Sequence, residues 1–85
     1  MYIISAMHKY DFENSFSWAY ACMDNGLFGS GMPCWTKSRR EAVIFESVEK
    51  AKEWFNKNHD YLNFSEIKRN TLAIRKCIYK TVKVL

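Results

Sequence analysis

Cysteine and histidine are the side chains of this chain that could bind a metal ion or serve as nucleophile and base. The 85 residues contain Cys22, Cys34, Cys77, His8 and His59. Structural zinc sites pair cysteines about two to four residues apart, and no cysteine pair here has that spacing. A nucleophilic cysteine needs a base beside it and a third group that orients the base, and no spacing indicates this. The sequence therefore predicts no metal, no cofactor and no catalytic residue, and a protein that is not an enzyme.

The odd number of cysteines also bears on the cellular compartment. Small secreted domains carry an even set that pairs into disulfides. Three irregularly spaced cysteines favour thiols in a reducing cytosol, with oxidation of Cys22 and Cys34 as the alternative. The start of the chain lacks a basic leader followed by an apolar run, and no window reaches the roughly 18 apolar residues of a membrane span. We expect a soluble, cytoplasmic protein with no membrane contact.

Three glycines lie within one predicted loop, residues 24–33. A phosphate-binding loop of the P-loop type ends in Lys followed by Ser or Thr, and this loop does not. The pattern is typical of a flexible strand connection. Two of its apolar residues, Phe28 and Met32, would then be available to a partner.

Positive charge is concentrated in the second part of the chain. The net charge is +4, and residues 37–85 carry twelve of the thirteen basic side chains but six of the nine acidic ones. From residue 67 onward there are six basic side chains and no acidic one. This asymmetry predicts one positive face, suited to nucleic acid or to an acidic protein. A solvated strand face would have the same pattern.

Two clusters mix basic and aromatic side chains, and each defines a candidate contact surface. The first joins the glycine loop to the segment after it, with Phe28, Met32, Trp35, Lys37, Arg39 and Arg40. Aromatic residues would anchor a protein partner there, and arginines would form charge-assisted pairs. On the alternative surface, basic residues around the last predicted strand would hold nucleic acid while aromatics stack bases. Its residues are Lys68, Arg69, Arg75, Lys76 and Lys80.

A small number of elements must position these side chains. β-Branched and aromatic residues predict strands at 2–8, 15–23, 42–45 and 71–84. A 3.6-residue apolar period follows the third strand, at Val48, Ala51, Trp54 and Phe55. Because Ser47 precedes this period, we predict an N-capped helix over 48–58. The order β-β-β-α-β predicts a single two-layer α+β domain over residues 1–85, with an antiparallel sheet of three to four strands covered by one main helix.

The second predicted strand has one aromatic face. Phe16, Trp18 and Tyr20 alternate with small side chains, as in a strand with two different faces. We expect these rings to be core beneath the helix. On an uncovered sheet face they would instead make a binding patch.

One motif joins the third predicted strand to the helix: Ala42-x-x-Phe45-x-Ser47-x-Glu49-x-Ala51-x-x-Trp54. With Trp35-Thr36 before it and a basic strand after it, residues 35–84 resemble many small bacteriophage and prophage proteins. The motif is structural, since it specifies a strand end, a helix cap and a packed tryptophan. Phe45-Glu46-Ser47 and Trp54-Phe55 also resemble the helix of a small anti-CRISPR protein. Several such inhibitors are acidic mimics of nucleic acid, whereas this chain is basic, which favours binding an acidic protein or nucleic acid itself.

We therefore expect a non-catalytic phage-type accessory protein that binds a host macromolecule in the host cytoplasm. The partner would be a host protein or a protein–nucleic-acid complex, and the most concrete version is an inhibitor of a bacterial defence complex. One alternative is a small basic nucleic-acid-binding protein. The other is a structural component of a phage particle or a homo-oligomer.

Overall fold

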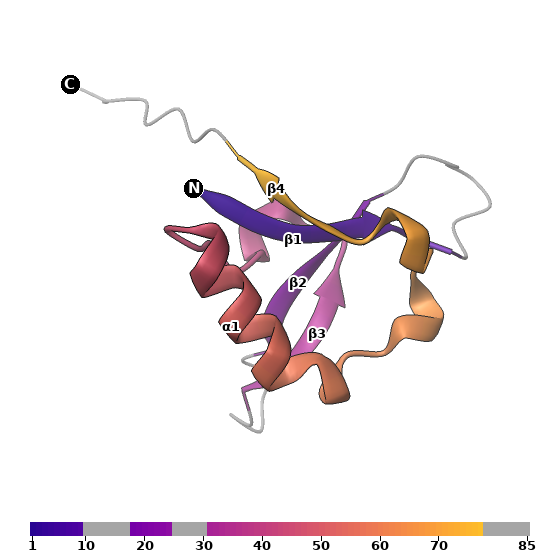
Figure 1. Ribbon diagram of the computed structural model, residues 1–85. Coiled ribbons are helices and arrows are strands. Elements are labelled where there is room, and N and C mark those ends of the chain that lie inside the picture. Colours follow the sequence, from indigo (N-terminus) through magenta and orange to yellow (C-terminus); the bar gives the residue numbers. More distant parts are fainter. Residues whose placement is uncertain (10–17, 25–30, 78–85) are drawn as a thin grey trace.

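Within the residues that the structure describes, four antiparallel strands and one α-helix follow the order β-β-β-α-β (Figure 1). The computed structural model describes residues 1–9, 18–24 and 31–77, so the predictions for Phe16, Phe28 and Lys80 lie outside the described residues. The strands are β1 (Tyr2–Met7), β2 (Trp18–Asp24), β3 (Met32–Thr36) and β4 (Ala73–Lys76). The helix is α1 (Val48–Asn58), and four 3-10 turns are η1 (Arg39–Glu41), η2 (His59–Tyr61), η3 (Phe64–Glu66) and η4 (Arg69–Thr71). The predicted α+β fold, with one main helix on an antiparallel sheet, is confirmed.

The first strand of the chain is a central strand of the sheet, whose order is β3-β2-β1-β4. β1 pairs antiparallel with β2 up to Met7↔Trp18, which confirms the expected reversal between the first two strands. On its other side β1 pairs antiparallel with β4, from Tyr2↔Lys76 to Ser5↔Ala73. The four residues of β1 from Ile3 to Ala6 are all buried, as expected for a strand with neighbours on both sides.

The position of the third strand differs from the prediction. We predicted it at 42–45, whereas the strand is β3, which pairs with β2 from Tyr20↔Thr36 to Asp24↔Met32. β3 lies at the edge of the sheet, and an edge strand tolerates Pro33 because one side of it makes no ladder hydrogen bonds. The proline and the nearby glycines made this stretch resemble the end of a loop.

Segment 42–45 instead occupies the space where β1 and β2 diverge. Phe45 exchanges both backbone hydrogen bonds with Tyr2 at the start of β1, at 2.8 Å each. On its other side, the Val43 N–H donates to the carbonyl of Ala21 on β2 at 3.0 Å. The segment is therefore a wedge bonded to two strands, and it leads directly into α1.

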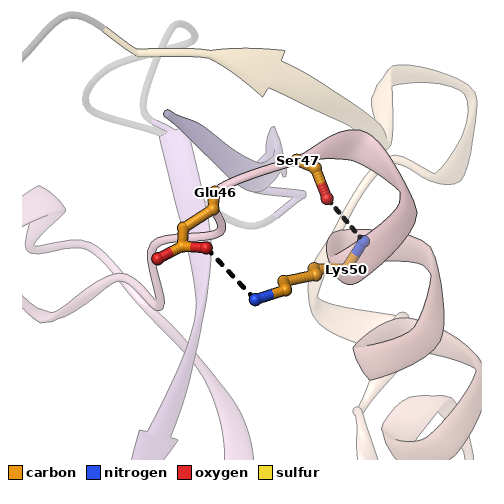
Figure 2. Close-up of polar contacts among 3 residues, drawn as sticks. All are labelled: Glu46, Ser47 and Lys50. Carbon is orange, nitrogen blue, oxygen red and sulfur yellow. Dashed lines mark hydrogen bonds and ion pairs between the residues drawn. The ribbon is translucent and has the colours of Figure 1, made fainter.

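The helix begins where the sequence predicts because Ser47 caps it. Ser47 has an extended backbone, and its Oγ accepts from the Lys50 N–H at 3.2 Å, which pairs one of the amides that a helix start leaves unbonded. Figure 2 shows the cap beside an ion pair between Lys50 Nζ and Glu46 Oε2, 3.1 Å apart. Both charged side chains of that pair are mostly exposed, so the pair contributes little stability.

The main core lies between α1 and the sheet face that carries small side chains. Ala51 on α1 is fully buried, in one cluster with Ile4, Ala21 and Phe45. The ring of Trp54 packs on that of Phe45, with centroids 5.7 Å apart. Alanine on both the helix and the strand allows the two backbones to approach closely, while the rings fill the space beside them.

The aromatic face of β2 points away from the helix, which corrects the prediction that its rings form the core beneath α1. Side chains alternate along a strand, so the burial of Ala19 and Ala21 on the helix side turns Trp18 and Tyr20 to the opposite face. We call this sheet face, which lies opposite α1, the distal face. Trp18 is 37% exposed there, and Tyr20 is partly buried and packs against the small cluster that contains Ile3.

The last described strand is shorter than predicted. Within the described residues β4 covers Ala73–Lys76, whereas we predicted 71–84, of which 78–84 lie outside the described residues. Leu72 and Ile74 pack against the main core. Thr71 belongs to the preceding 3-10 turn, where its Oγ1 accepts from the Met7 N–H at 2.8 Å.

Candidate binding site on the distal sheet face

A shallow depression lies on the distal face, where β1, β2 and β4 are neighbours. Its volume is about 180 Å³, and its lining residues are Ile3, Ser5, Trp18, Tyr20, Arg39, Arg75 and Lys76. Three of these residues are cationic and two are aromatic, and none of the described residues that line it is acidic. We call it the cationic depression.

Arg75 reaches from β4 across the central strand toward β2. Its Nη1 donates to the Ser5 carbonyl at 2.7 Å and to Ser5 Oγ at 3.0 Å, and its Nη2 donates to the Thr71 carbonyl at 2.8 Å. The guanidinium lies over the ring of Trp18, with Cζ 4.5 Å from the ring centroid, which is a cation–π contact. Ser5 is 1% exposed, and its small side chain leaves room for Arg75 to cross β1. Arg75 therefore holds β4 and Trp18 in place while it adds a permanent positive charge to the depression.

The other two cations of the depression come from separate elements. Lys76 is the last residue of β4 and Arg39 is the first residue of η1, and both are exposed. A hydrogen-bonded turn after β3 supports η1, because Thr36 Oγ1 donates to Glu41 Oε2 at 2.7 Å and accepts from the Ser38 N–H at 3.1 Å. This turn holds η1 next to β2, where Arg39 lines the depression. Lys76 alternates with Arg75 along β4 and pairs with Tyr2, which packs against the main core, so the strand directs the Lys76 side chain toward the helix side of the sheet. Arg39 and Arg75 are therefore the positive charges that favour an anionic ligand in the depression.

This arrangement is suited to binding. Guanidinium and ammonium groups form strong, charge-assisted hydrogen bonds with phosphate and carboxylate oxygens. Partly exposed tryptophan and tyrosine rings present flat surfaces on which a planar ligand can stack. The lining contains one serine, Ser5. Its Oγ accepts a hydrogen bond from Arg75, which holds the hydroxyl beside the guanidinium group.

The structure divides the first predicted contact surface. Met32 is 45% exposed at the start of β3, and Lys37, Arg39 and Arg40 are exposed. Trp35 instead packs against the main core, on the helix side of the sheet, with its ring centroid 6.4 Å from that of Phe64. Its Nε1 is buried, and no described residue accepts a hydrogen bond from it. Trp35 therefore packs against the core, whereas its neighbours Met32 and Lys37 are exposed.

The second predicted surface is also divided. Arg75 and Lys76 line the cationic depression together with Arg39, so the structure brings members of both predicted surfaces to one place. Lys68 and Arg69 are exposed near η4 and do not line the depression. The guanidinium of Arg69 lies 4.8 Å from the ring centroid of Phe64.

Trp18 and Tyr20 were not among the residues predicted for either surface. Their alternation with small residues was visible in the sequence, but it does not say which face of the strand the helix covers. The alanines at positions 19 and 21 were the available signal, since a helix that packs through Ala51 needs small residues opposite it. That reasoning would have placed the rings of Trp18 and Tyr20 on the distal face.

The cysteine and histidine side chains have local partners. Cys22 and Cys34 occupy opposed positions on β2 and β3, with their Sγ atoms 2.6 Å apart. His59 Nδ1 lies 2.9 Å from the Asn56 carbonyl. Among residues 1–9, 18–24 and 31–77, no three His, Cys, Asp or Glu side chains gather as a metal site would require. Across the same described segments, no helix has the length and apolar character needed to cross a membrane.

Comparisons of the chain with protein-family models, with curated proteins and with solved structures return no match. The function must therefore be argued from the chemistry of the distal face itself.

Proposed function

We propose that this protein is a non-catalytic accessory protein that binds an acidic macromolecule on its distal face. Single-stranded nucleic acid is the ligand whose chemistry fits this face best. The observation that carries the proposal is the cationic depression, which Arg39 and Arg75 line together with Trp18 and Tyr20.

A single strand matches both kinds of side chain in the depression. Its phosphates pair with cations, and its unstacked bases offer flat faces to aromatic rings. The bases of a duplex are stacked on one another and cannot lie on the sheet in this way. Among the described residues α1 covers the other face of the sheet, and Trp18 is 37% exposed on the distal face, where a base of a single strand can reach its ring.

The proposal predicts a specific dependence on salt. Contact with phosphates releases counterions, so the logarithm of the affinity falls with the logarithm of the salt concentration, with a slope of about −0.7 for each phosphate that is neutralised on a single strand. The two arginines imply a slope of about −1.4, which corresponds to roughly 7-fold weaker binding when salt rises fourfold. Fluorescence anisotropy with labelled single-stranded DNA and RNA oligomers measures both the affinity and the slope.

Three variants test which residues make the contact. Arg39→Ala should weaken binding and make the slope less negative by about 0.7. Trp18→Leu should weaken binding by about 5-fold to 150-fold through lost stacking, with the slope unchanged. Lys52→Ala, an exposed lysine on α1, is the matched control and should change neither. Absence of binding at low salt, or equal effects of Lys52→Ala and Arg39→Ala, would refute the proposal.

A second candidate is an acidic host protein, most concretely a component of a bacterial defence complex. The observation that favours it is the β3 edge, where Met32 is 45% exposed and where exposed Lys37 and Arg40 follow the strand. An exposed strand edge can accept another strand, and an apolar residue with nearby cations suits an acidic partner.

Affinity capture from a bacterial lysate distinguishes the two candidates. A partner that survives nuclease treatment, and that is lost with the double variant Arg39→Ala and Arg40→Ala, supports the protein-binding candidate. The matched control replaces two exposed helix lysines, Lys50 and Lys52, with alanine. Capture that disappears with nuclease supports the nucleic-acid proposal instead.

A further inference from the structure

Cys22 and Cys34 form a thiol pair that is independent of the proposed nucleic-acid contact. They are directly opposed on adjacent antiparallel strands, β2 and β3. Opposed residues in such a pair have Cα atoms about 4.5–5.5 Å apart, and this separation lies within the range of about 4.4–6.8 Å that a disulfide requires. Their Sγ atoms already lie 2.6 Å apart. The backbone therefore does not have to move for the two sulfur atoms to bond.

The two thiols differ in their access to solvent. Cys22 is 4% exposed, whereas Cys34 is partly exposed. Both line a second depression, of about 790 Å³, together with Thr36, Arg40 and Glu41. A small molecule that enters this depression contacts Cys34 before Cys22, because Cys34 is the more exposed thiol. If the molecule carries carboxylates, the Arg40 guanidinium can pair with them.

The third cysteine lies in different surroundings. Cys77 is buried with Ile3 and Ala42, in a cluster that contains neither Cys22 nor Cys34. Its burial removes it from direct attack by a dissolved oxidant. The chain thus combines one accessible thiol, one buried thiol opposite it, and a third thiol set apart.

We propose that Cys22 and Cys34 are a reversible redox pair that closes a disulfide between β2 and β3 by exchange with a small disulfide such as oxidised glutathione. The Cys34 thiolate attacks one sulfur of the small disulfide, which forms a mixed disulfide and releases one glutathione thiolate. The Cys22 thiolate, after losing its proton to solvent, then attacks Cys34 Sγ, forms the cross-strand disulfide and releases the second glutathione. The protein loses two electrons and two protons, and the small disulfide is reduced to two thiols.

The closed disulfide would secure the edge strand of the sheet. β3 is bonded to the rest of the sheet through β2 alone, and the new bond would close a loop between residues 12 positions apart. Because the folded chain holds the two sulfurs together, the equilibrium constant for forming the disulfide should be larger in the native protein than in the unfolded one. The disulfide should raise the equilibrium constant for folding by the ratio of these two constants.

The test is equilibration of the purified protein with glutathione redox buffers, followed by acid quenching, alkylation and intact mass measurement. The Cys77→Ser variant isolates the pair. We expect it to lose the mass of two hydrogen atoms, to retain no alkylatable thiol, and to reach half-oxidation at a reduced-to-oxidised ratio at least about 10-fold more reducing than the same variant in concentrated urea. A native pair that oxidises no more readily than the unfolded chain would overturn the proposal.

Two further variants test the order of the exchange. Cys34→Ser should form no disulfide and acquire no glutathione on buried Cys22. Cys22→Ser should accumulate the mixed disulfide on Cys34, because the resolving thiol is missing. If Cys22→Ser fails to fold, a non-reducing peptide map of the oxidised wild-type protein decides the matter. A Cys22–Cys34 linkage supports the proposal, and a linkage or glutathione adduct at Cys77 contradicts it.

Discussion

Replacing Arg75 with methionine tests whether the arginine holds the sheet together, since methionine keeps an unbranched side chain but removes the guanidinium. The change deletes three hydrogen bonds, two to Ser5 and one to the Thr71 carbonyl, and the contact with the Trp18 ring. Hydrogen bonds to charged groups contribute about 1.5–3 kcal/mol each. These three share one partly buried side chain, so they are not additive, and we take about 3 kcal/mol for the set. The cation–π contact adds about 0.5–1 kcal/mol.

Guanidinium chloride unfolding, followed by circular dichroism, measures the effect. With a slope of about 2 kcal/mol per molar denaturant, a loss of 3–4 kcal/mol should lower the midpoint by roughly 1.5–2 M. Such a loss is a large part of the roughly 5–15 kcal/mol that stabilises a typical domain. Arg75→Lys should recover less than half of the loss, because an ammonium group cannot bridge the Ser5 and Thr71 acceptors as the planar fork does.

Two controls separate this effect from a general loss of charge. Lys76→Met removes a neighbouring positive charge from the same strand at an exposed position, and it should change the free energy of unfolding by less than about 0.5 kcal/mol. A double-mutant cycle between Arg75→Met and Trp18→Leu should give a coupling of about 0.5–1 kcal/mol. If Arg75→Met costs less than about 1 kcal/mol, or no more than Lys76→Met, the arginine is not the structural link described above.

Three further changes test the helix and its packing. Ser47→Ala should lower the free energy of unfolding by about 1 kcal/mol through loss of the N-cap bond, measured by thermal unfolding; an unchanged midpoint would show that the cap is not formed. Ala51→Leu should lower it by about 1–3 kcal/mol through overpacking of a fully buried site, measured by urea unfolding, and no effect would mean that α1 does not approach the sheet closely. Glu46→Gln should change it by less than about 0.5 kcal/mol because the ion pair with Lys50 is exposed, and a larger loss in low-salt thermal unfolding would contradict that assignment.

The helix could be predicted from the sequence because its determinants are local. Ser47 and the apolar residues that follow it are close along the chain, so capping and periodicity could both be recognised before any tertiary contact was known. The element order agrees for a different reason, because β3 at Met32–Thr36, which was not predicted, takes the place of the strand predicted at 42–45. The position of the third strand could not, because what makes Pro33 acceptable in β3 is the edge position of that strand, which is a property of the assembled sheet.

The candidate site was predictable only in pieces. Arg39 and Arg75 were selected from the sequence as members of two different surfaces, and their shared position follows from strand order and from the turn after β3. The rings of Trp18 and Tyr20 needed one further fact, namely which face of β2 the helix covers. That fact depends on how Ala21 and Ala51 pack together, and alternation along a single strand contains no information about it.

The central position of β1 has a consequence for the synthesis of this chain on the ribosome. β1 is made before the other described strands, yet its partner β4 follows it by a large separation, such as the 70 positions between Ser5 and Arg75. Contacts of such high sequence separation form late and slow the folding of small domains. Until residues 73–76 have emerged, the nascent β1 has an open edge that other nascent chains could pair with. The short strand β4 therefore protects the first strand of the fold from association with other chains.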